Sequence, residues 1–463
     1  MHGKCVSGNS RIFLEDGAII KAEELFNIAK EEGQKFEEKE DYIIYDISNL
    51  NIKTFSLNKE TGNIEIKPIS LAWKLKGGNL INVKLRNGFN ISTTPEHRFI
   101  VLENMDFVEK EAKDIKLGDR IICTRRLETN SKLNIKKEIL LRLAKKRFYI
   151  RFNKEYGKKI KDIIIKNRTR KVAKKIGTDI NEMVFYKTCC QEDRYILKDI
   201  IAISQLFNID LEEIYDNIIS IRFRTGGRRG KSSNIMSIPK NFEDFFYLAG
   251  LFIGDGHEKK FIVGKEELGN KFIQLCKDLD ISLTFRNYPS RCKEIVTNQT
   301  LSEILNSLFD YPLKKKSHNV KVSDFVLKAP EEYSSKLLKG YFDTDGCVEK
   351  SRRAVTLTTA SNNMIQDLSL FLLRFGCIPI IEKDNTITIS GSSAVNFMKE
   401  IGFFMKEKTL KGQNLINTLR GSSVSDTILI TTTKGYKQIL LNQIDEPSRF
   451  CKIYNINPKV LNQ

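Results

Sequence analysis

The chain has 463 residues, room for roughly three domains of the usual ~150 residues, and carries a formal charge of +19. It contains no apolar run of the ~18 residues that a membrane-spanning helix needs, and its first residues lack the apolar stretch of a secretion signal. We therefore expect a soluble, cytoplasmic protein. The nine cysteines show no paired CxxC spacing, which argues against a zinc site or a redox dithiol. The positive charge favours a polyanionic partner, because fixed cations that neutralise phosphates release counterions.

Residues 1–130 are predicted to form a compact all-β domain. Its short β-rich runs include SRIFL, KTFSL, NLINVKL and RFIVL. Asp-Gly, Thr-Gly and Asn-Gly pairs at residues 16–17, 61–62 and 87–88 separate several of these runs and are typical of hairpin turns. One amphipathic helix, from Lys21 to about Lys30, is expected to interrupt the strands.

Two segments of this domain carry candidate chemistry. CVSGNSRIFLEDG begins at Cys5, and NGFNISTTPEHRFIV holds Thr94 and His97 in a T-x-x-H spacing. Together they resemble the two N-terminal splicing blocks of inteins, the self-splicing family with the Hint fold. The resemblance implies that the Cys5 thiolate attacks the carbonyl of Lys4 in an N-to-S acyl shift. It also implies that His97 protonates the departing amide nitrogen and that Thr94 holds and polarises the strained peptide.

The other end of the chain argues against complete splicing. Inteins close with a His-Asn pair before a Cys, Ser or Thr nucleophile, whereas no histidine lies after residue 318 and the sequence ends in LNQ. The run CKIYNINP, residues 451–458, resembles only the opening of the family's penultimate block. Residues 411–463 are therefore expected to be a degenerate, truncated remnant, and the four residues before Cys5 leave no host protein to be joined. A buried thiol at Cys5 and a structural histidine at position 97 are the alternative to a working cleavage site.

The composition changes sharply between residues 131 and 240, which hold 27 Lys plus Arg against 12 Asp plus Glu. Basic and apolar residues mix at roughly helical spacing, so we expect small helices whose basic outer faces lie on phosphates. Residues 197–218 indicate a further helical pair. A basic Gly-rich loop or strand pair follows, and its side chains that could reach DNA are Arg222, Arg224, Arg228, Arg229 and Lys231. The region is predicted to be a basic helical DNA-recognition insert, with a merely solvated basic surface as the alternative.

An internal repeat is the most informative feature of the sequence. LAGLFIGDG, residues 248–256, recurs as LKGYFDTDG, residues 338–346, and each copy places one aspartate, Asp255 or Asp345, directly before a glycine. Small residues four apart on one face of each copy allow two helices to approach closely. The repeat therefore predicts a packed pair of helices with an aspartate at the end of each.

Helix C-termini are poor places for carboxylates, because the macrodipole disfavours an anion there by about 0.3–1 kcal/mol. If the two helices pack as a pseudo-twofold pair, Asp255 and Asp345 converge at one end and their repulsion needs a cation. Oxygen ligands with open positions suit Mg²⁺, which can activate water and stabilise the leaving oxygen of a phosphodiester. We expect Gly256 and Gly346 to end the helices in left-handed caps.

The two copies resemble the LAGLIDADG, or DOD-type, homing endonucleases, of the intein-associated type with both repeats in one chain. The resemblance assigns the last aspartate of each motif, Asp255 and Asp345, to metal binding. It implies an α+β duplicated core over residues 241–410, with αββαββα halves at about 241–330 and 331–410 related by a pseudo-twofold axis within a monomer. The sheets of the two halves would form a basic saddle on a long, asymmetric double-stranded DNA site and read base edges in the major groove.

The resemblance also implies two catalytic lysines, since a cation beside the scissile phosphate stabilises developing charge. In the family one lysine precedes a segment leading into AP-E, and VKVSDFVLKAPEE puts Lys321 there. The other precedes a strand ending in Ser-Gly, and EKDNTITISG puts Lys383 there. An exposed, salt-bridging lysine is the alternative at both positions.

The sequence therefore predicts a mixed fold: an all-β Hint-like domain, a basic helical insert and a duplicated α+β core. The predicted function is Mg²⁺-dependent, site-specific cleavage of both strands of DNA by the paired aspartates. One alternative is an intein-type self-processing protein that splices or cleaves itself at Cys5. Another is a nuclease-dead protein that binds DNA or RNA.

Overall fold

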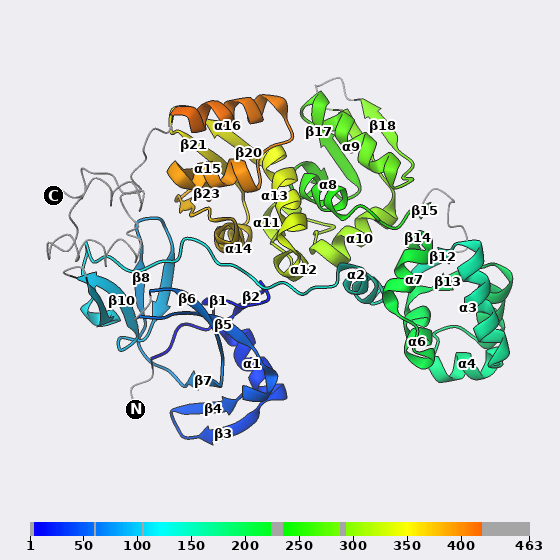
Figure 1. Ribbon diagram of the computed structural model, residues 1–463, viewed down its shortest axis with the longest axis horizontal. Helices are drawn as coiled ribbons and strands as arrows, with labels where there is room; N and C mark the ends of the chain where they lie inside the picture. Colours follow the sequence, from blue (N-terminus) through cyan, green and yellow to red (C-terminus); the bar gives the residue numbers. More distant parts are fainter. Residues whose placement is uncertain (1–3, 60–61, 104–105, 224–234, 288–292, 419–463) are drawn as a thin grey trace, which may run out of the picture.

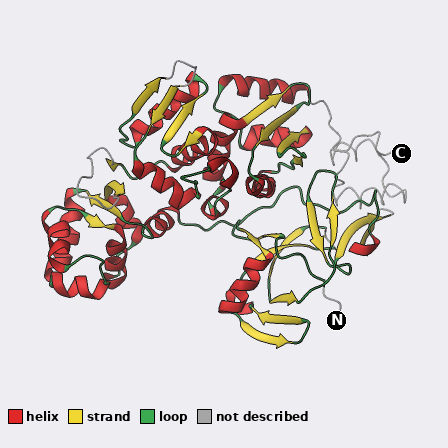
Figure 2. Ribbon diagram, turned by 180° about the vertical axis from the view of Figure 1, so that it is seen from behind, coloured by secondary structure: helices red, strands yellow, loops and turns green. Residues whose placement is uncertain are grey.

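The computed structural model describes residues 4–59, 62–103, 106–223, 235–287 and 293–418. Three parts follow one another along the chain (Figure 1): a region of β-hairpins, a helical region around one small sheet, and a core of paired helices and sheets. Seen from behind in Figure 2, strands dominate the first part, whereas helices and strands mix in the other two. Within the described residues, no helix is both long enough and apolar enough to cross a bilayer. Most of the predicted C-terminal remnant, from residue 419 onward, lies outside the described residues.

The N-terminal part consists of small antiparallel sheets, in agreement with the predicted β domain. Its elements are β1 (Arg11–Phe13), β2 (Ile19–Lys21), α1 (Ala22–Glu32), β3 (Gln34–Glu38), β4 (Tyr42–Asp46), η1 (Ser48–Leu50), β5 (Lys53–Leu57), β6 (Ile64–Pro68), β7 (Leu71–Leu75), β8 (Ile81–Lys84), β9 (Asn90–Thr93), β10 (Arg98–Glu103), β11 (Asp106–Glu111) and η2 (Ala112–Asp114). Strands β1–β2, β5–β6, β8–β9 and β10–β11 form hairpins, and β3-β4-β7 form a three-stranded sheet. Helix α1 lies where a helix was predicted and buries Leu25, Phe26 and Ala29 against this sheet.

The second part contains the predicted helices and a four-stranded sheet, of which the sequence predicted only a possible strand pair beginning at Ile221. Its elements are α2 (Ile135–Leu143), β12 (Phe148–Phe152), α3 (Lys154–Lys166), α4 (Thr169–Ile176), α5 (Glu182–Tyr186), the π-helical turn η3 (Lys187–Gln191), β13 (Tyr195–Ile196), α6 (Leu197–Phe207), α7 (Leu211–Asn217), β14 (Ile218–Phe223) and β15 (Ile235–Met236). The strands pair antiparallel in the order β13-β12-β14-β15. Four of the five basic residues predicted to reach DNA, residues 224 to 231, lie outside the described residues, whereas Arg222 lies on β14.

The outer helices of this part are amphipathic in the predicted sense. Helix α3 buries Tyr156, Ile160 and Ile164, while Lys158 and Lys166 are exposed. Because buried and exposed residues alternate at helical spacing, the basic side chains form the outer face of the helix. The apolar core beneath them is continuous with the core of the third part.

The third part is a duplicated core. Its first half contains α8 (Phe242–Asp255), β16 (Gly256–His257), β17 (Lys260–Val263), α9 (Glu266–Asp278), β18 (Thr284–Asn287), β19 (Lys293–Val296) and α10 (Gln299–Phe309). Its second half contains α13 (Glu331–Asp345), β20 (Gly346–Glu349), β21 (Ala354–Thr358), α14 (Asn362–Phe371) with the 3₁₀-turn η5 (Leu372–Phe375), β22 (Ile380–Ile381), β23 (Thr386–Ser390) and α15 (Gly391–Glu400). The sheets β16-β17-β19-β18 and β20-β21-β23-β22 share one strand order, so both halves repeat one topology. Three further helices are α11 (Lys316–Asn319), α12 (Asp324–Lys328) and α16 (Lys406–Thr418).

Helices α8 and α13 carry the sequence repeat and pack with their backbones in contact. A Cβ added to Gly250 would lie 2.9 Å from the amide nitrogen of Tyr341, and one added to Gly340 would lie 3.0 Å from that of Leu251. Any side chain at these two positions would force the helices apart, and overpacking of this kind costs about 1–3 kcal/mol. The small residues of the repeat thus allow the close approach that the sequence predicts.

The predicted left-handed caps at Gly256 and Gly346 are wrong. Their φ and ψ angles are −80° and 147° and −81° and 154°, respectively, which is extended backbone, because each residue begins a strand. Glycine is needed there for space instead. An added Cβ would lie 2.9 Å from the Cα of Phe252 in the first half and 3.0 Å from the Cα of Phe342 in the second. Each helix therefore passes directly into its sheet.

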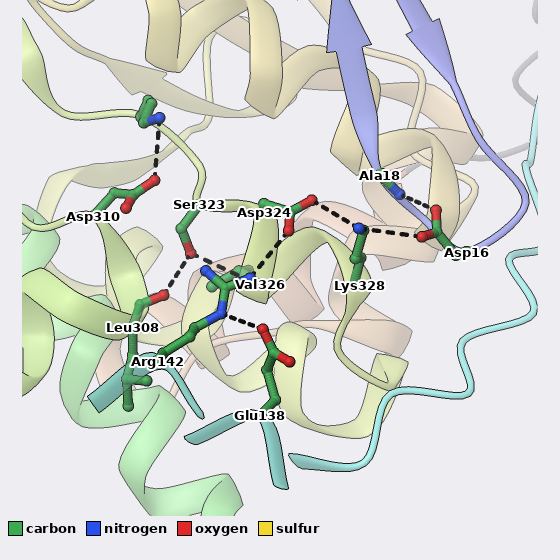
Figure 3. A network of polar contacts seen from close by, with 11 residues as sticks. Asp16, Ala18, Glu138, Arg142, Leu308, Asp310, Ser323, Asp324, Val326 and Lys328 are labelled. Carbon is green, nitrogen blue, oxygen red and sulfur yellow. Dashed lines mark hydrogen bonds and ion pairs between the residues drawn. The ribbon is translucent and has the colours of Figure 1, made fainter. Parts of the chain in front are cut away.

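Helix α12 joins all three parts of the chain (Figure 3). The Lys328 Nζ pairs with Asp16 of the N-terminal part at 3.3 Å and with Asp324 at 3.4 Å. Asp324 in turn pairs with Arg142 of α2 at 3.0 Å. One short helix of the core thus contacts both the hairpin region and the basic region through ion pairs.

Two hairpin turns of the N-terminal part also contact the core. Gly17, between β1 and β2, has φ +93°, and an added Cβ would lie 3.4 Å from the Arg374 guanidinium. Gly88, between β8 and β9, has φ +89°, and an added Cβ would lie 2.8 Å from the Cβ of Ile381. Both turns need glycine for their left-handed backbone and for the contact itself. The hairpin region is therefore seated on the second half of the core.

Candidate functional site

The two aspartates of the repeat end their helices side by side. Asp255 is the last residue of α8 and Asp345 is the last residue of α13. A Cβ added to Gly254, the neighbour of Asp255, would lie only 3.1 Å from Oδ1 of Asp345. The contact between the helices thus brings one carboxylate over the end of the other helix.

Two lysines that the sequence analysis did not select cap these helix ends. The Lys316 Nζ donates to the carbonyl oxygen of Gly254. The Lys408 Nζ donates to the carbonyl oxygens of Phe342 at 3.0 Å, Asp343 at 2.6 Å and Gly346 at 2.5 Å. A positive charge at a helix C-terminus offsets the negative end of the macrodipole and satisfies its free carbonyl groups. These lysines therefore counter the unfavourable placement of the aspartates.

The lysines occupy equivalent places in the two halves. Lys316 lies 62 residues after Gly254, and Lys408 lies 64 residues after Thr344, which matches Gly254 in the repeat. The sequence around the first is YPLKKKS and around the second FFMKEKT, with a lysine followed by a hydroxyl residue in both. Asp310 and Gly402, just before these segments, share a left-handed backbone with φ of 52° and 61°. Extending the repeat search beyond the two aspartate motifs would have found both lysines.

The four charged groups act on one another as a cluster. The pKa of Asp345 is raised to about 6, first by desolvation and then by repulsion from Asp255, against the opposing effect of Lys316 and Lys408. Solvent reaches the Asp345 side chain, but the surrounding protein still removes much of its hydration. Desolvation also raises the pKa of Asp255 and lowers the pKa of both lysines. Each carboxylate therefore lies within electrostatic reach of both ammonium groups.

The cluster suits a small, hard cation. Two carboxylates that repel each other gain from a divalent ion between them. Among the described residues, no group of three or more His, Cys, Asp or Glu side chains gathers at one point. An ion held by Asp255 and Asp345 would therefore keep positions open for water and phosphate oxygens, as Mg²⁺ commonly does.

The lysines selected from the sequence have other surroundings. Lys321 pairs with Asp310 at 3.1 Å. Lys383 is exposed in the turn between β22 and β23. Neither makes a contact with Asp255 or Asp345 among the described residues, and their catalytic roles stay predictions.

The residues proposed for peptide-bond chemistry lie together around the Lys4–Cys5 bond. The Cys5 N–H donates to Thr94 Oγ1 at 3.0 Å, and the Thr94 N–H donates to the Cys5 carbonyl oxygen at 2.9 Å. The His97 side chain forms a hydrogen bond with the backbone of Lys4, and its Nδ1 is buried with no partner in the described part of the chain. Burial raises the pKa of the Cys5 thiol and lowers the pKa of His97. Thr94 and His97 thus contact both sides of this peptide bond.

The comparison with protein families decides the relationship of the chain. The family model of the intein splicing domain matches residues 12–408, which is most of the chain. The chain belongs to the intein splicing domain family.

Similar segments occur in larger proteins. The intein is 32% identical over 428 residues to elongation factor 2 of Methanopyrus kandleri, with 91% of this chain and 33% of that protein covered. It is 32% identical over 444 residues to a protein of Methanocaldococcus jannaschii named probable translation initiation factor IF-2, with 91% and 34% covered. A reverse gyrase of the latter organism is 28% identical over 426 residues, with 87% and 23% covered. The intein thus spans about a third or less of the length of these relatives.

Solved structures are similar over parts of the intein. The PabCDC21-1 intein is 28% identical, with 26% of this chain and 73% of that chain covered and a TM-score of 0.25. The homing endonuclease I-DmoI in complex with DNA and Ca is 16% identical, with 35% and 91% covered and a TM-score of 0.28.

We predict that Asp345→Asn stabilises the fold at alkaline pH when no divalent cation is present. The folded-state pKa of about 6 lies above the ordinary 3.8, so the folded protein binds this proton more tightly than the unfolded chain. The ionised carboxylate therefore costs stability, and the cost grows as the pH rises from about 4 to above 6. Removing the charge is expected to raise the free energy of unfolding near pH 8 by about 1 kcal/mol, a value reduced for solvent screening.

Chemical denaturation in EDTA near pH 4 and near pH 8 measures this effect. The expected gain is much smaller near pH 4, where the folded state is protonated and the unfolded state is close to its own pKa of 3.8. Asp384→Asn, in an exposed turn, is the control and is expected to change nothing at either pH. A gain of equal size at both pH values would contradict the assignment.

Proposed function

We propose that this intein carries a site-specific endonuclease that cuts both strands of DNA, with Mg²⁺ held by Asp255 and Asp345. The observation that carries the proposal is the convergence of two carboxylates and two lysines at the end of one helix pair. Packing alone would favour apolar or neutral residues there, because each desolvated charge costs free energy. A function that uses the charges explains why they are present.

The residues of the chain supply distinct parts of the proposed reaction. Asp255 and Asp345 would hold Mg²⁺, which supplies a water of lowered pKa and stabilises the leaving oxygen of a phosphodiester. Lys316 and Lys408 place fixed positive charge beside this point, where negative charge on the phosphate develops. Because helix-end carbonyls already hold the ammonium groups, little reorganisation is needed during the reaction.

The proposed substrate is a long, asymmetric double-stranded site. The exposed lysines on the outer faces of the second part, such as Lys158 and Lys166, would contact the phosphate backbone and add affinity without sequence information. The two halves of the core belong to one chain, so we propose that a monomer acts on both strands through its pseudo-twofold arrangement.

The distribution of similar segments supports an element that moves between genes. An elongation factor, an initiation factor and a reverse gyrase share the segment, and it is a minor part of each. An element that inserts into unrelated genes benefits from cutting DNA at a chosen site. Site-specific cleavage accounts for this pattern better than DNA binding alone.

Asp255→Asn and Asp345→Asn are each expected to reduce Mg²⁺-dependent cleavage about 10²-fold or more, because each removes a ligand of the ion. DNA binding is expected to persist, since the basic surface is unchanged. Linearisation of a plasmid that carries the target site measures cleavage, and a gel-shift titration measures binding. Normal cutting by the Asp255→Asn, Asp345→Asn double variant would contradict the proposal.

The same assay separates the two pairs of candidate lysines. Lys316→Met and Lys408→Met are expected to slow cutting more than Lys321→Met and Lys383→Met. Reversed effects would favour the pair chosen from the sequence, and equal effects would contradict the expected difference. Binding without Mg²⁺-dependent nicking on any bound site would instead identify a nuclease-dead DNA- or RNA-binding protein.

A second function, self-processing at the Lys4–Cys5 bond, is favoured by the contacts around Cys5. Attack of the Cys5 Sγ on the Lys4 carbonyl carbon forms a thioester and breaks the amide C–N bond. The freed nitrogen gains the proton that the thiol loses, and His97 lies at the Lys4 backbone where it can relay that proton. Thr94 Oγ1 accepts the N–H of the same nitrogen and holds it in place.

We expect purified protein to lose the residues before Cys5, because hydrolysis of the thioester releases them. Added thiol is expected to increase the loss by attacking the thioester. The intact mass measures the cleaved fraction, with Cys5→Ala as the variant that cannot form the thioester. Equal loss in wild type and Cys5→Ala points to an external protease, and no loss even with thiol excludes the reaction.

A further inference from the structure

The two halves of the core differ at one buried position of the repeat. Three residues before the last glycine of the repeat, the first half has Ile253 and the second half has Asp343. Both side chains are buried, with 4% and 1% of their surface exposed. A carboxylate buried as deeply as Asp343 needs hydrogen-bond donors, and its partners therefore indicate its use.

Asp343 binds the loop that leads into helix α16. Its carboxylate accepts the Phe404 N–H at 3.0 and 3.1 Å and the Met405 N–H at 3.2 Å, and the Tyr247 hydroxyl donates to it at 2.9 Å. Helix α16 begins at the next residue, Lys406, and Lys408 lies in its first turn. The carboxylate thus fixes the start of the helix that carries Lys408.

The first half reaches the same arrangement without a carboxylate. Pro312 stands four residues before Lys316, where Phe404 stands four residues before Lys408. Proline has no N–H to donate, so a carboxylate opposite it would lose that partner. Ile253 accordingly fills the equivalent position with an apolar side chain in the core. The two halves therefore hold their lysines by different means.

We propose that Asp343 is a positioning residue that fixes Lys408 in the second half of the site. The inference rests on the proposed nuclease function. It adds that the two halves of the site depend differently on Asp343. Lys408 binds the end of α13, whereas Lys316 binds the end of α8. Loss of Asp343 therefore impairs the half that uses Lys408 and slows the cutting of one DNA strand more than the other.

Asp343→Ala is tested on a duplex whose two strands carry different end labels. We expect the rate of cutting one strand to fall about tenfold more than the rate of cutting the other. A factor of this size follows from the loss of one charge-assisted hydrogen bond. Asp343→Asn keeps an acceptor oxygen for the two amides and is expected to restore much of the balance. Where Asp343→Ala does not fold, the smaller imbalance expected of Asp343→Asn is the readout, and equal slowing of both strands by Asp343→Asn overturns the inference.

Ile253→Ala is the matched control, because it truncates a buried side chain at the equivalent position of the first half. It is expected to slow both strands together. If Asp343→Ala also slows both strands equally, Asp343 has only a structural role and the inference is overturned.

A second readout does not need nuclease activity. Acetic anhydride at limiting concentration labels lysines, and peptide mass spectrometry gives the rate at each one. In Asp343→Ala we expect Lys408 to be labelled about tenfold faster than in wild type, because its ammonium group leaves the helix-end carbonyls, while Lys316 is unchanged. If wild-type protein cuts no DNA, the proposed function fails, and the labelling alone decides whether Asp343 positions Lys408. An unchanged rate of Lys408 labelling in Asp343→Ala would then overturn the inference.

Discussion

The contact between the backbones of α8 and α13 determines how the two halves of the core are placed. Gly250 and Gly340 permit it, since an added Cβ at either position would fall about 3 Å or less from the facing backbone. The contact sets the distance between the helix ends and hence brings Asp255 and Asp345 together. The two sheets follow directly from these helix ends, so their mutual orientation also depends on the same pair.

Charge at the helix ends opposes the close packing of the two helices. Two carboxylates at helix C-termini oppose the macrodipole and each other. Lys316 and Lys408 offset this by binding the last carbonyl groups of α8 and α13. The lysines compensate the negative charge only in part, because the pKa of Asp345 is still raised. A bound divalent cation would compensate the remaining charge. The electrostatic cost of the two carboxylates is thereby linked to the proposed activity.

The sequence predicted best what depends on local rules. Asp-Gly and Asn-Gly pairs marked hairpin turns at Gly17 and Gly88, because few other residues tolerate that backbone. Small residues at helical spacing marked the packed pair, and the repeat placed both aspartates at helix ends. The helices of the basic region were also found, since their apolar residues recur at helical spacing.

The misses have physical reasons. Gly256 and Gly346 are extended because the next strand begins at once, and sequence alone does not separate a glycine needed for space from one needed for its φ angle. Strand β12, with the sequence FYIRF, lies between lysine-rich segments that are typical of helices. The sequence analysis therefore predicted a helix there. Lys316 reaches α8 from a distant segment of the chain, and only the longer repeat that it shares with the segment around Lys408 marks it in the sequence.

The chain unites two candidate chemistries in one fold. The hairpin region holds Cys5, Thr94 and His97 around a peptide bond, and the core holds the aspartates and lysines. Ion pairs of Lys328 and Asp324 connect the hairpin region, the basic region and the core at helix α12. The two candidate sites share no residue. Either activity can therefore be lost without removing the groups that the other needs.

Cutting of DNA at a chosen site by the paired aspartates can be measured on whole genomic DNA. The purified protein is incubated with Mg²⁺ and genomic DNA of the organism that encodes it, and the new double-strand ends are then sequenced. We expect ends at one or a few defined sites, absent in EDTA and absent with the Asp255→Asn, Asp345→Asn double variant. Ends that the double variant produces equally well, or no new ends under any condition with divalent cation, would contradict it.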